Sequence, residues 1–250
     1  MLQMPPAPSL SGSVNYLLKT RYKDDDVMEA GIDEAGRGCF WGPLMAAAVV
    51  LQPEAEWDDE MRALAPKLRD SKKVSPKRRV ELAAAIKRCA LAHGVGAVSA
   101  TDLDAYGVTW ANKTAFQRAV GELAVRPGRL VIDGILPCEY NAGEVVTVIN
   151  GDATLMSIAA ASILAKEAHD DWVRAYCAAH PDVDERYNLL SCKGYGTAKH
   201  RAALAEHGEH EEHRQRFIHG GGKTAGGYSK SGGSTSKCLI AIEDADAGLE

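Results

Sequence analysis

The sequence lacks the features that mark membrane and secreted proteins. No apolar run is long enough to span a bilayer, and the N-terminal residues have no basic flank followed by an apolar stretch. The six cysteines are scattered and no two of them form a CxxC pair, which argues against a zinc ribbon and favours reduced thiols. We therefore expect a cytoplasmic protein that does not bind membranes.

A net positive charge, the usual mark of a nucleic-acid-binding protein, is also missing, because the 250 residues carry a formal net charge of −5. The charge is nevertheless uneven, since basic residues crowd one short stretch that only Asp70 opposes. These residues are Lys67, Arg69, Lys72, Lys73, Lys77, Arg78 and Arg79. Most such runs are solvated surface, but a local basic patch can bind phosphates whatever the net charge.

The most informative stretch runs from Met28 to Leu51. Residues 30–32 are predicted to form a short strand that ends in Asp33 and Glu34, and a glycine-rich turn and an apolar strand over 44–51 follow. Charge at the end of a buried strand is costly unless it is paired or binds a metal, and glycine lets backbone amides approach a phosphate. The alternative is an ordinary hairpin with an acidic tip.

Helices and strands alternate after this hairpin. The pattern predicts helices over residues 75–91, 110–124 and 154–177 and from 198, and strands over 94–100, 130–132 and 145–149. In the first helix Val80, Ala84 and Ile86 are expected to face the core. The order indicates an α/β fold with a mixed central sheet flanked by helices. We expect a flexible N-terminal extension (1–27), one folded domain (28–219) and a disordered Gly/Ser-rich tail (220–250).

Acidic residues follow three of the predicted strands, at Asp33 and Glu34, at Asp133 and at Asp152. Ligands gather at strand ends in α/β sheets, and clustered carboxylates suit Mg²⁺ or Mn²⁺. Two such ions about 4 Å apart can clamp the attacking and leaving oxygens of a phosphodiester. Singly, Asp152 is better explained as a helix cap and Asp133 as an Asp-Gly turn. Together with the glycine turn and the lysines, a metal site is the better explanation.

The chain resembles the ribonuclease HII family, the type 2 ribonucleases H, in five blocks that follow the family's order over about residues 28–218. The blocks are Gly31–Gly38 with Gly42-Pro43; Asp70–Lys73; Ile132–Gly134; Gly151-Asp152 with Ser157–Lys166; and Lys193–Thr197 followed by His200, His213-Arg214 and Phe217. Each block alone is modest evidence, whereas all five in order are highly specific.

The resemblance implies an RNase H-like fold with a C-terminal helical part. It also implies hydrolysis of the RNA strand of RNA–DNA hybrids and cutting 5′ of single ribonucleotides in duplex DNA, with 3′-hydroxyl and 5′-phosphate products. Asp33, Glu34, Asp133 and Asp152 match the family's catalytic, metal-binding acids. We expect two divalent cations, Mg²⁺ or Mn²⁺, during catalysis, no obligate protein partner and a monomer.

The family's substrate contacts match a further set of residues. They are Gly36, Arg37, Gly38, Lys72, Lys73 and Tyr195. The resemblance implies that the turn reads the ribose 2′-hydroxyl, the group that distinguishes RNA from DNA. It implies that the tyrosine packs on the neighbouring sugar and that the lysines hold backbone phosphates. Arginine in the turn favours type HII over the sister HIII class, whose turn has lysine.

Three positions depart from the family pattern. Gly107 stands where many members have asparagine, His169 replaces an arginine, and Cys192 replaces a histidine. We expect these changes to tune affinity and leave the metal ligands intact.

Two other signals are discounted. Gly222-Lys223-Thr224 resembles the end of a P-loop by chance. We interpret His207, His210 and His213 as a solvated surface, because glutamates are interleaved with them.

Two alternatives to the ribonuclease remain, a catalytically silent hybrid-binding protein and a DNA resolvase of the same fold.

Overall fold

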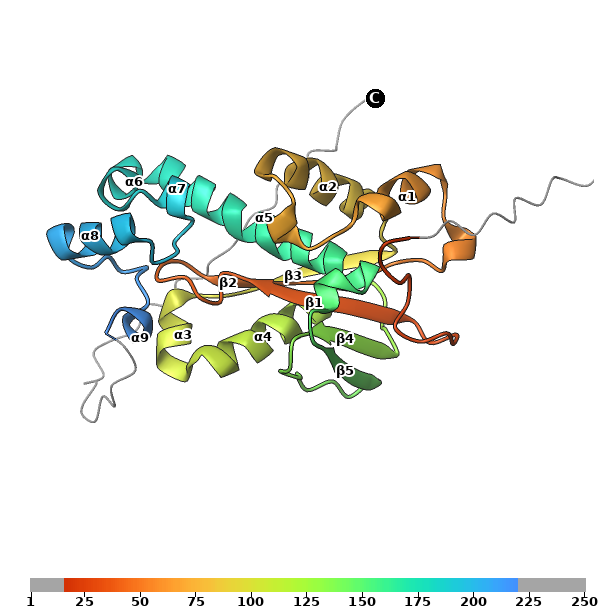
Figure 1. The fold of residues 1–250 in the computed structure, drawn as a ribbon. Helices are drawn as coiled ribbons and strands as arrows, with labels where there is room; N and C mark the ends of the chain where they lie inside the picture. Colours follow the sequence, from red (N-terminus) through yellow and green to blue (C-terminus); the bar gives the residue numbers. More distant parts are fainter. Residues whose placement is uncertain (1–15, 220–250) are drawn as a thin grey trace, which may run out of the picture. The chain divides into compact units, whose positions relative to one another are not determined.

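The computed structural model describes residues 16–219, which form a mixed sheet with helices on both faces (Figure 1). The strand order is β3-β2-β1-β4-β5, with β1 antiparallel to β2 and parallel to β4. The strands are β1 (Glu29–Ala35), β2 (Leu44–Val50), β3 (Ala92–Val98), β4 (Arg129–Asp133) and β5 (Glu144–Val148). The predicted α/β class with a mixed central sheet is confirmed.

Helices α1, α2 and α5 cover one face of the sheet, and α3 and α4 cover the other (Figure 1). The α-helices are α1 (Asp59–Leu64), α2 (Pro76–Cys89), α3 (Ala100–Tyr106), α4 (Val108–Gly121), α5 (Met156–Ala179), α6 (Pro181–Tyr187), α7 (Leu189–Cys192), α8 (Ala198–His207) and α9 (Gln215–Ile218). Short 3₁₀ turns are η1 (Glu54–Glu56), η2 (Ala65–Lys67), η3 (Ser71–Lys73) and η4 (Gly151–Ala153). The helices from α6 onward form the predicted C-terminal helical part.

The central strand β1 lies directly against α5. A Cβ atom at Gly31 would lie 2.2 Å from the backbone carbon of Ser157, so only glycine permits this approach. The alanines at 159–161 are fully buried in the same layer, as the small-residue segment predicted. Alternate residues of β2 enter the two cores, so this strand is apolar along its whole length, and Ala30 and Ile32 of β1 enter the core beneath α4.

The predicted inward face of α2 was wrong at two positions. Val80 and Ala84 are exposed, and the buried face consists of Arg79, Leu82, Ala83 and Ile86. The face is displaced because a buried arginine, paired with acids of α5, occupies a position that a hydrophobic pattern assigns to solvent. The pattern also missed α3, whose start is capped by Ser99 accepting from the amide of Asp102 at 3.0 Å. The preceding strand therefore ends at Val98.

The described part of the predicted N-terminal extension, residues 16–27, differs from the expected flexible segment. Leu18 is buried in the core that α2 and α5 share, and the amide of Lys19 donates to the carbonyl of Thr154 at 2.9 Å. The predicted tail from 220 and the P-loop-like residues 222–224 lie outside the described residues.

Candidate active site

The acids predicted to form the site all lie at one edge of the sheet. Asp33 and Glu34 lie in the last three residues of β1, which ends at Ala35 and is therefore longer than predicted. Asp133 is the last residue of the parallel neighbour β4. Ile32 pairs with Ile132, so the two strands deliver their acids to the same level. Asp133 Oδ1 accepts a 2.7 Å hydrogen bond from the amide of Gly151, which ties it to the η4 turn that carries Asp152.

Asp33 and Asp152 are buried, Glu34 and Asp133 are half-buried, and the acids lie close enough to affect one another. Burial raises the pKa of Asp33 well above its usual value, and the charges of Glu34 and Asp133 add to the rise. Burial also raises the pKa of Asp152, again with a contribution from Asp133. The pKa of Glu34 is raised mainly by burial and is held down in part by the charge of Arg37. Full ionisation of these acids is therefore costly unless a cation neutralises them.

A hard divalent cation fits the chemistry of this set of donors. Asp33 and Asp152 expose only 6% and 8% of their surface, and carboxylate oxygens are the ligands that Mg²⁺ and Mn²⁺ prefer. Between residues 16 and 219, however, no three carboxylate, imidazole or thiol groups converge as tightly as the ligands of a bound ion do. Asp133, for example, uses one oxygen for the amide of Gly151. The four acids share an edge but do not enclose a single point.

Positions 36 and 38 of the predicted ribose-reading turn are glycine for different reasons. Gly36 has φ +76°, and a Cβ there would lie 2.4 Å from the buried ring of His169, so the fold itself requires glycine. A Cβ on Gly38 would meet no atom within 4 Å, and its φ is not left-handed. Nothing inside the protein requires glycine at position 38. Close approach of a ligand to the backbone would explain it.

The arginine of this turn lies between the acids and solvent. Arg37 Nη1 is 3.6 Å from Glu34 Oε1, and its side chain is 56% exposed. The Glu34 side chain is only 16% exposed, so the pair joins a partly buried acid to an exposed guanidinium. The guanidinium is accessible to a ligand next to the carboxylates.

Arg214 holds the turn from beneath, a role that the sequence did not indicate. Its fully buried guanidinium donates from Nη1 to the carbonyls of Gly36 (2.7 Å) and Arg37 (3.1 Å), and from Nε to that of Gly42 (2.8 Å). Its Nη2 has no partner among the described residues. Only membership of a motif block marked this residue, because its partners are backbone carbonyls far away in the sequence.

Tyr195 lies beside the same turn. Its backbone bridges to Cys39, and the carbonyl of the adjacent Gly194 accepts from the amide of Phe40 at 2.8 Å. The ring is 37% exposed and lies 5.4 Å from the ammonium group of Lys166. The structure therefore brings the predicted tyrosine and the predicted turn together at the surface.

The two predicted phosphate-binding lysines are exposed on η3. Asp70 caps this turn by accepting from the amide of Lys72 at 2.9 Å, and the hydroxyls of Ser71 and Ser162 are 2.9 Å apart. The charge of Lys72 opposes the rise in the pKa of Glu34 and of Asp152, so it lies on the side of the acids. Lys73 lines a separate hollow.

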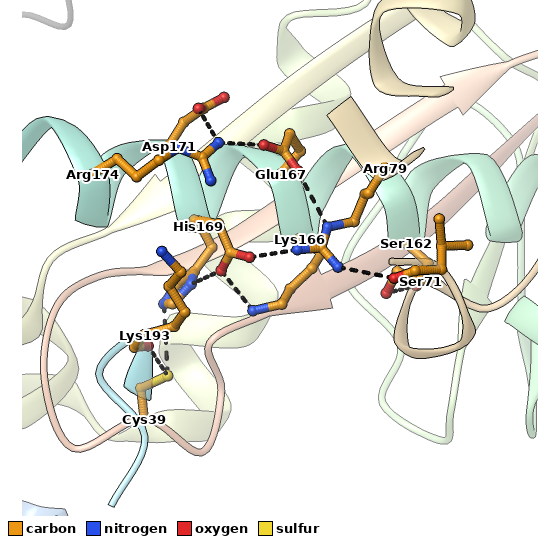
Figure 2. Close-up of polar contacts among 12 residues, drawn as sticks. Cys39, Ser71, Arg79, Ser162, Lys166, Glu167, His169, Asp171, Arg174 and Lys193 are labelled. Carbon is orange, nitrogen blue, oxygen red and sulfur yellow. Dashed lines mark hydrogen bonds and ion pairs between the residues drawn. The ribbon is translucent and has the colours of Figure 1, made fainter. Parts of the chain in front are cut away.

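A buried ion network fastens α2 to α5 (Figure 2). Arg79 donates to Asp170 at 2.7 Å and to Glu167 at 3.2 Å, while Lys166 donates to Asp170 at 2.6 Å. His169, one of the departures from the family pattern, is fully buried beneath Gly36 and 3.6 Å from Cys39 Sγ. It therefore supports the turn. Sequence patterns could not find these pairs, because each joins distant elements.

The second and third departures are structural as well. Gly107 has φ +90° where α3 ends and α4 begins, and it offers no side chain for a contact. Cys192 is buried with its sulfur 3.7 Å from His200 Nδ1. On α4, the almost fully buried amide of Asn112 favours the charged form of Glu34, a contact that the sequence analysis missed.

The expectation of a solvated histidine surface was wrong for His213. This residue is 1% exposed and its Nε2 lies 3.1 Å from His200 Nε2. The amide of His210 donates to His213 Nδ1, so the proton of His213 is on Nε2, and His200 Nδ1 then donates to the carbonyl of Tyr195 at 3.0 Å. Burial, with the neighbouring histidines, lowers the pKa of His213 to about 4. The pair is neutral and supports the backbone of Tyr195.

No helix between residues 16 and 219 combines the length and apolar character needed to cross a membrane.

Comparison with known proteins gives a consistent result. The family model described as Ribonuclease HII matches residues 30–219. A ribonuclease HII from Bacteroides thetaiotaomicron is 43% identical over 78% of this chain and 92% of its own length. One from Moorella thermoacetica is 44% identical over 76% of this chain and 86% of its own length.

Two solved archaeal structures share the fold. The ribonuclease H2 from Pyrococcus horikoshii matches with a TM-score of 0.60 at 22% identity, over 76% of this chain and 95% of that one. The RNase HII from Archaeoglobus fulgidus, solved as a PCNA:RNase HII complex, matches with a TM-score of 0.60 at 27% identity and the same coverage.

Proposed function

Because the chain belongs to the ribonuclease HII family, we propose that it cuts DNA duplexes on the 5′ side of a single embedded ribonucleotide as well as the RNA strand of RNA–DNA hybrids. Family membership makes it a ribonuclease H, an endoribonuclease for RNA–DNA hybrids. The proposal extends this activity to the isolated ribonucleotide and to products with 3′-hydroxyl and 5′-phosphate ends.

In the proposed mechanism, Asp33, Glu34, Asp133 and Asp152 hold two Mg²⁺ or Mn²⁺ ions. Bound there, the cations would activate water and stabilise the leaving oxygen of the phosphodiester. The observation that carries this proposal is geometric: the pairing of Ile32 with Ile132 brings Asp33 and Asp133 to the same end of the sheet, and Asp133 accepts from the amide of Gly151, the residue before Asp152. Carboxylates in such a cluster supply the negative charge that a divalent cation neutralises.

Selection of ribose is assigned to the turn and to the tyrosine that packs beside it. Gly38 has no internal reason to be glycine, and Arg37 lies 3.6 Å from a proposed metal ligand, so a 2′-hydroxyl read here would be next to the scissile phosphate. Tyr195 offers an exposed ring for the neighbouring sugar. Lys72 and Lys73 would position the backbone without reading sequence.

A cleavage assay separates this function from its two alternatives. The substrates are a duplex with one ribonucleotide and its all-DNA counterpart, each incubated with Mg²⁺ or Mn²⁺. We expect one cut, 5′ of the ribonucleotide, in the first duplex alone. No cutting with either metal would favour the hybrid-binding protein, and equal cutting of both duplexes would favour the resolvase. Asp33→Asn should abolish turnover while leaving binding largely intact, and full activity of that variant would refute the site.

We further propose a cytoplasmic monomer that needs no protein partner for cutting. The Archaeoglobus fulgidus relative was solved in a complex with PCNA, so the assay should compare rates with and without a sliding clamp. An unchanged rate is expected.

A further inference from the structure

A hollow lined by basic side chains lies next to the proposed active site. Lys67, Arg69, Lys73 and Arg78 line it, and the buried Val74 and Leu82 contribute its apolar part. Only Lys73 is among the residues already assigned to substrate binding. The other cations come from η2, from the segment that follows it and from the first turn of α2.

Positive charge in this hollow is poorly neutralised by the protein. Within the described residues, Arg78 pairs with Glu81 at 2.6 Å, whereas no carboxylate lies within ion-pair distance of the ammonium and guanidinium groups of Lys67, Arg69 and Lys73. Asp70 is the nearest acid in sequence, and its Oδ1 already accepts from the amide of Lys72. Like charges held together in this way attract an anion.

The start of α2 adds to the attraction. Ser75, at the N-cap, makes no side-chain hydrogen bond to the first turn and lines the hollow, so the free amides of this 14-residue helix are left for another acceptor. Next to the hollow, the buried Arg79 is bonded to Glu167, Asp170 and the carbonyl of Val74. These bonds hold the walls of the hollow in place before any ligand arrives.

One 3₁₀ turn connects the hollow to the acids. On η3 the hydroxyl of Ser71 lies 2.9 Å from that of Ser162 on α5, the helix that packs against β1, whereas Lys73 of the same turn lines the hollow. A nucleic-acid strand whose scissile phosphate lies at the acids can therefore cross η3 and reach the hollow. We propose that the hollow binds a backbone phosphate of the substrate duplex other than the one that is cut. This inference rests on the proposed function and adds a second anchoring point to it.

The decisive measurement is the salt dependence of duplex binding. In the non-cutting Asp33→Asn background, the Kd of a duplex with one ribonucleotide is measured between 50 and 200 mM salt, with and without Lys67→Gln and Arg69→Gln together. Loss of one phosphate contact should reduce the slope of log Kd against log salt by about one, so the affinity deficit of the double variant shrinks about threefold over this range. The exchange Lys67→Arg with Arg69→Lys should preserve the slope.

A matched control comes from exposed cations that do not line the hollow and have no ion pair among the described residues. Lys87→Gln with Arg126→Gln removes the same charge and should leave the slope within error of the parent. Equal slope changes in the two double variants would mean that the effect is one of general electrostatics, and this would overturn the proposal. An unchanged slope in both variants would also overturn it. Thermal midpoints of all variants should match the parent, since the exchanged side chains are exposed.

A titration with inorganic phosphate at constant ionic strength tests whether the hollow is instead a site for free phosphate. Phosphate bound by the parent and not by the hollow variant, together with an unchanged duplex slope, would make this a site for free anions and overturn the duplex assignment. Cutting by the otherwise unaltered chain is assayed separately. If it cuts but the slope is unchanged, only this inference fails. If it does not cut, the proposed function fails.

Discussion

Arg214 donates a 2.7 Å hydrogen bond to the carbonyl oxygen of Gly36, a residue that precedes it by 178 positions. The same guanidinium also donates to the carbonyls of Arg37 and Gly42, so one side chain from the C-terminal helical part holds the turn at three carbonyls, in addition to the support that His169 gives Gly36. A planar group with donors in fixed directions can serve several carbonyls at once.

Replacing Arg214 by lysine should separate charge from geometry. The ammonium group cannot reach all three carbonyls, so buried acceptors lose partners at a cost of about 1–3 kcal/mol in the free energy of unfolding. We expect a higher KM for the ribonucleotide substrate and a smaller preference over all-DNA duplex. Thermal unfolding and the ratio of kcat/KM values measure both effects. Arg186→Lys, at an exposed arginine, is the control, and equal behaviour of the two variants would contradict the role of Arg214.

The two glycines of the turn provide a matched pair. Gly36→Ala forces a Cβ to within 2.4 Å of the His169 ring at φ +76°, so stability should fall by about 1–3 kcal/mol. Gly38→Ala meets nothing inside the protein, so the free energy of unfolding should change by less than about 0.5 kcal/mol. The latter variant should nevertheless raise the KM of the ribonucleotide substrate, because the added methyl group blocks approach to the backbone. Unaltered kinetics in Gly38→Ala would remove this turn from the binding site.

Asp33→Asn should stabilise the protein when divalent cations are chelated. Burial first, and the charges of Glu34 and Asp133 second, raise the pKa of Asp33, so the folded state holds a proton that the unfolded chain releases. The stabilising contribution of the Asp33 proton is therefore fully present below the unfolded-state pKa of 3.8 and is lost as the pH rises toward the higher pKa of the folded state. At pH 7 the amide escapes this loss, and each kcal/mol gained should raise Tm by about 2–4 °C.

Added Mg²⁺ or Mn²⁺ should reverse this order of stability, so that the parent chain unfolds at a higher Tm than Asp33→Asn. The cation binds the folded protein and raises the Tm of the parent chain, whereas Asp33→Asn should respond weakly. Differential scanning calorimetry with and without chelator measures both arms. A parent Tm that ignores the cation would count against metal binding by these acids.

The His200–His213 pair should make the protein sensitive to acid. A folded pKa of His213 lowered from 6.5 to about 4 means that the unfolded chain takes up a proton first as the pH falls. Stability is therefore complete above pH 6.5 and declines between 6.5 and 4, by on the order of 3 kcal/mol at full effect. Urea unfolding across this range should show a shallower decline in His213→Gln. His207→Gln, at an exposed position, should follow the parent.

Local signals in the sequence predicted a mixed sheet with acids near the ends of its strands, and the structure has both features. Asp33, Asp133 and Asp152 each follow an apolar strand, and parallel strands must bring such ends to one edge, which the pairing of Ile32 with Ile132 confirms. The roles of the acids as metal ligands stay a prediction. Close approach of α5 to the sheet was also readable, because alanines leave room for it.

What the sequence could not give depends on partners far apart. Arg79 was assigned to solvent with the other basic residues, although Asp170, 91 positions later, makes it a buried residue and turns the face of α2. His213 was assigned to the surface because glutamates precede it, whereas its environment is set by Tyr187 and His200. Periodicity describes each helix by itself, so it cannot report a charge that another helix neutralises.

The central place of β1 in the sheet has a consequence for how the protein is made. Its neighbour β4 begins 100 positions after β1, at Arg129, and the α5 backbone that packs on Gly31 comes later still. A ribosome therefore releases the first two acids long before the elements that will surround them. Nascent chains that end before Arg129 leave the β4-facing edge of β1 unpaired, and such an edge can pair with another chain.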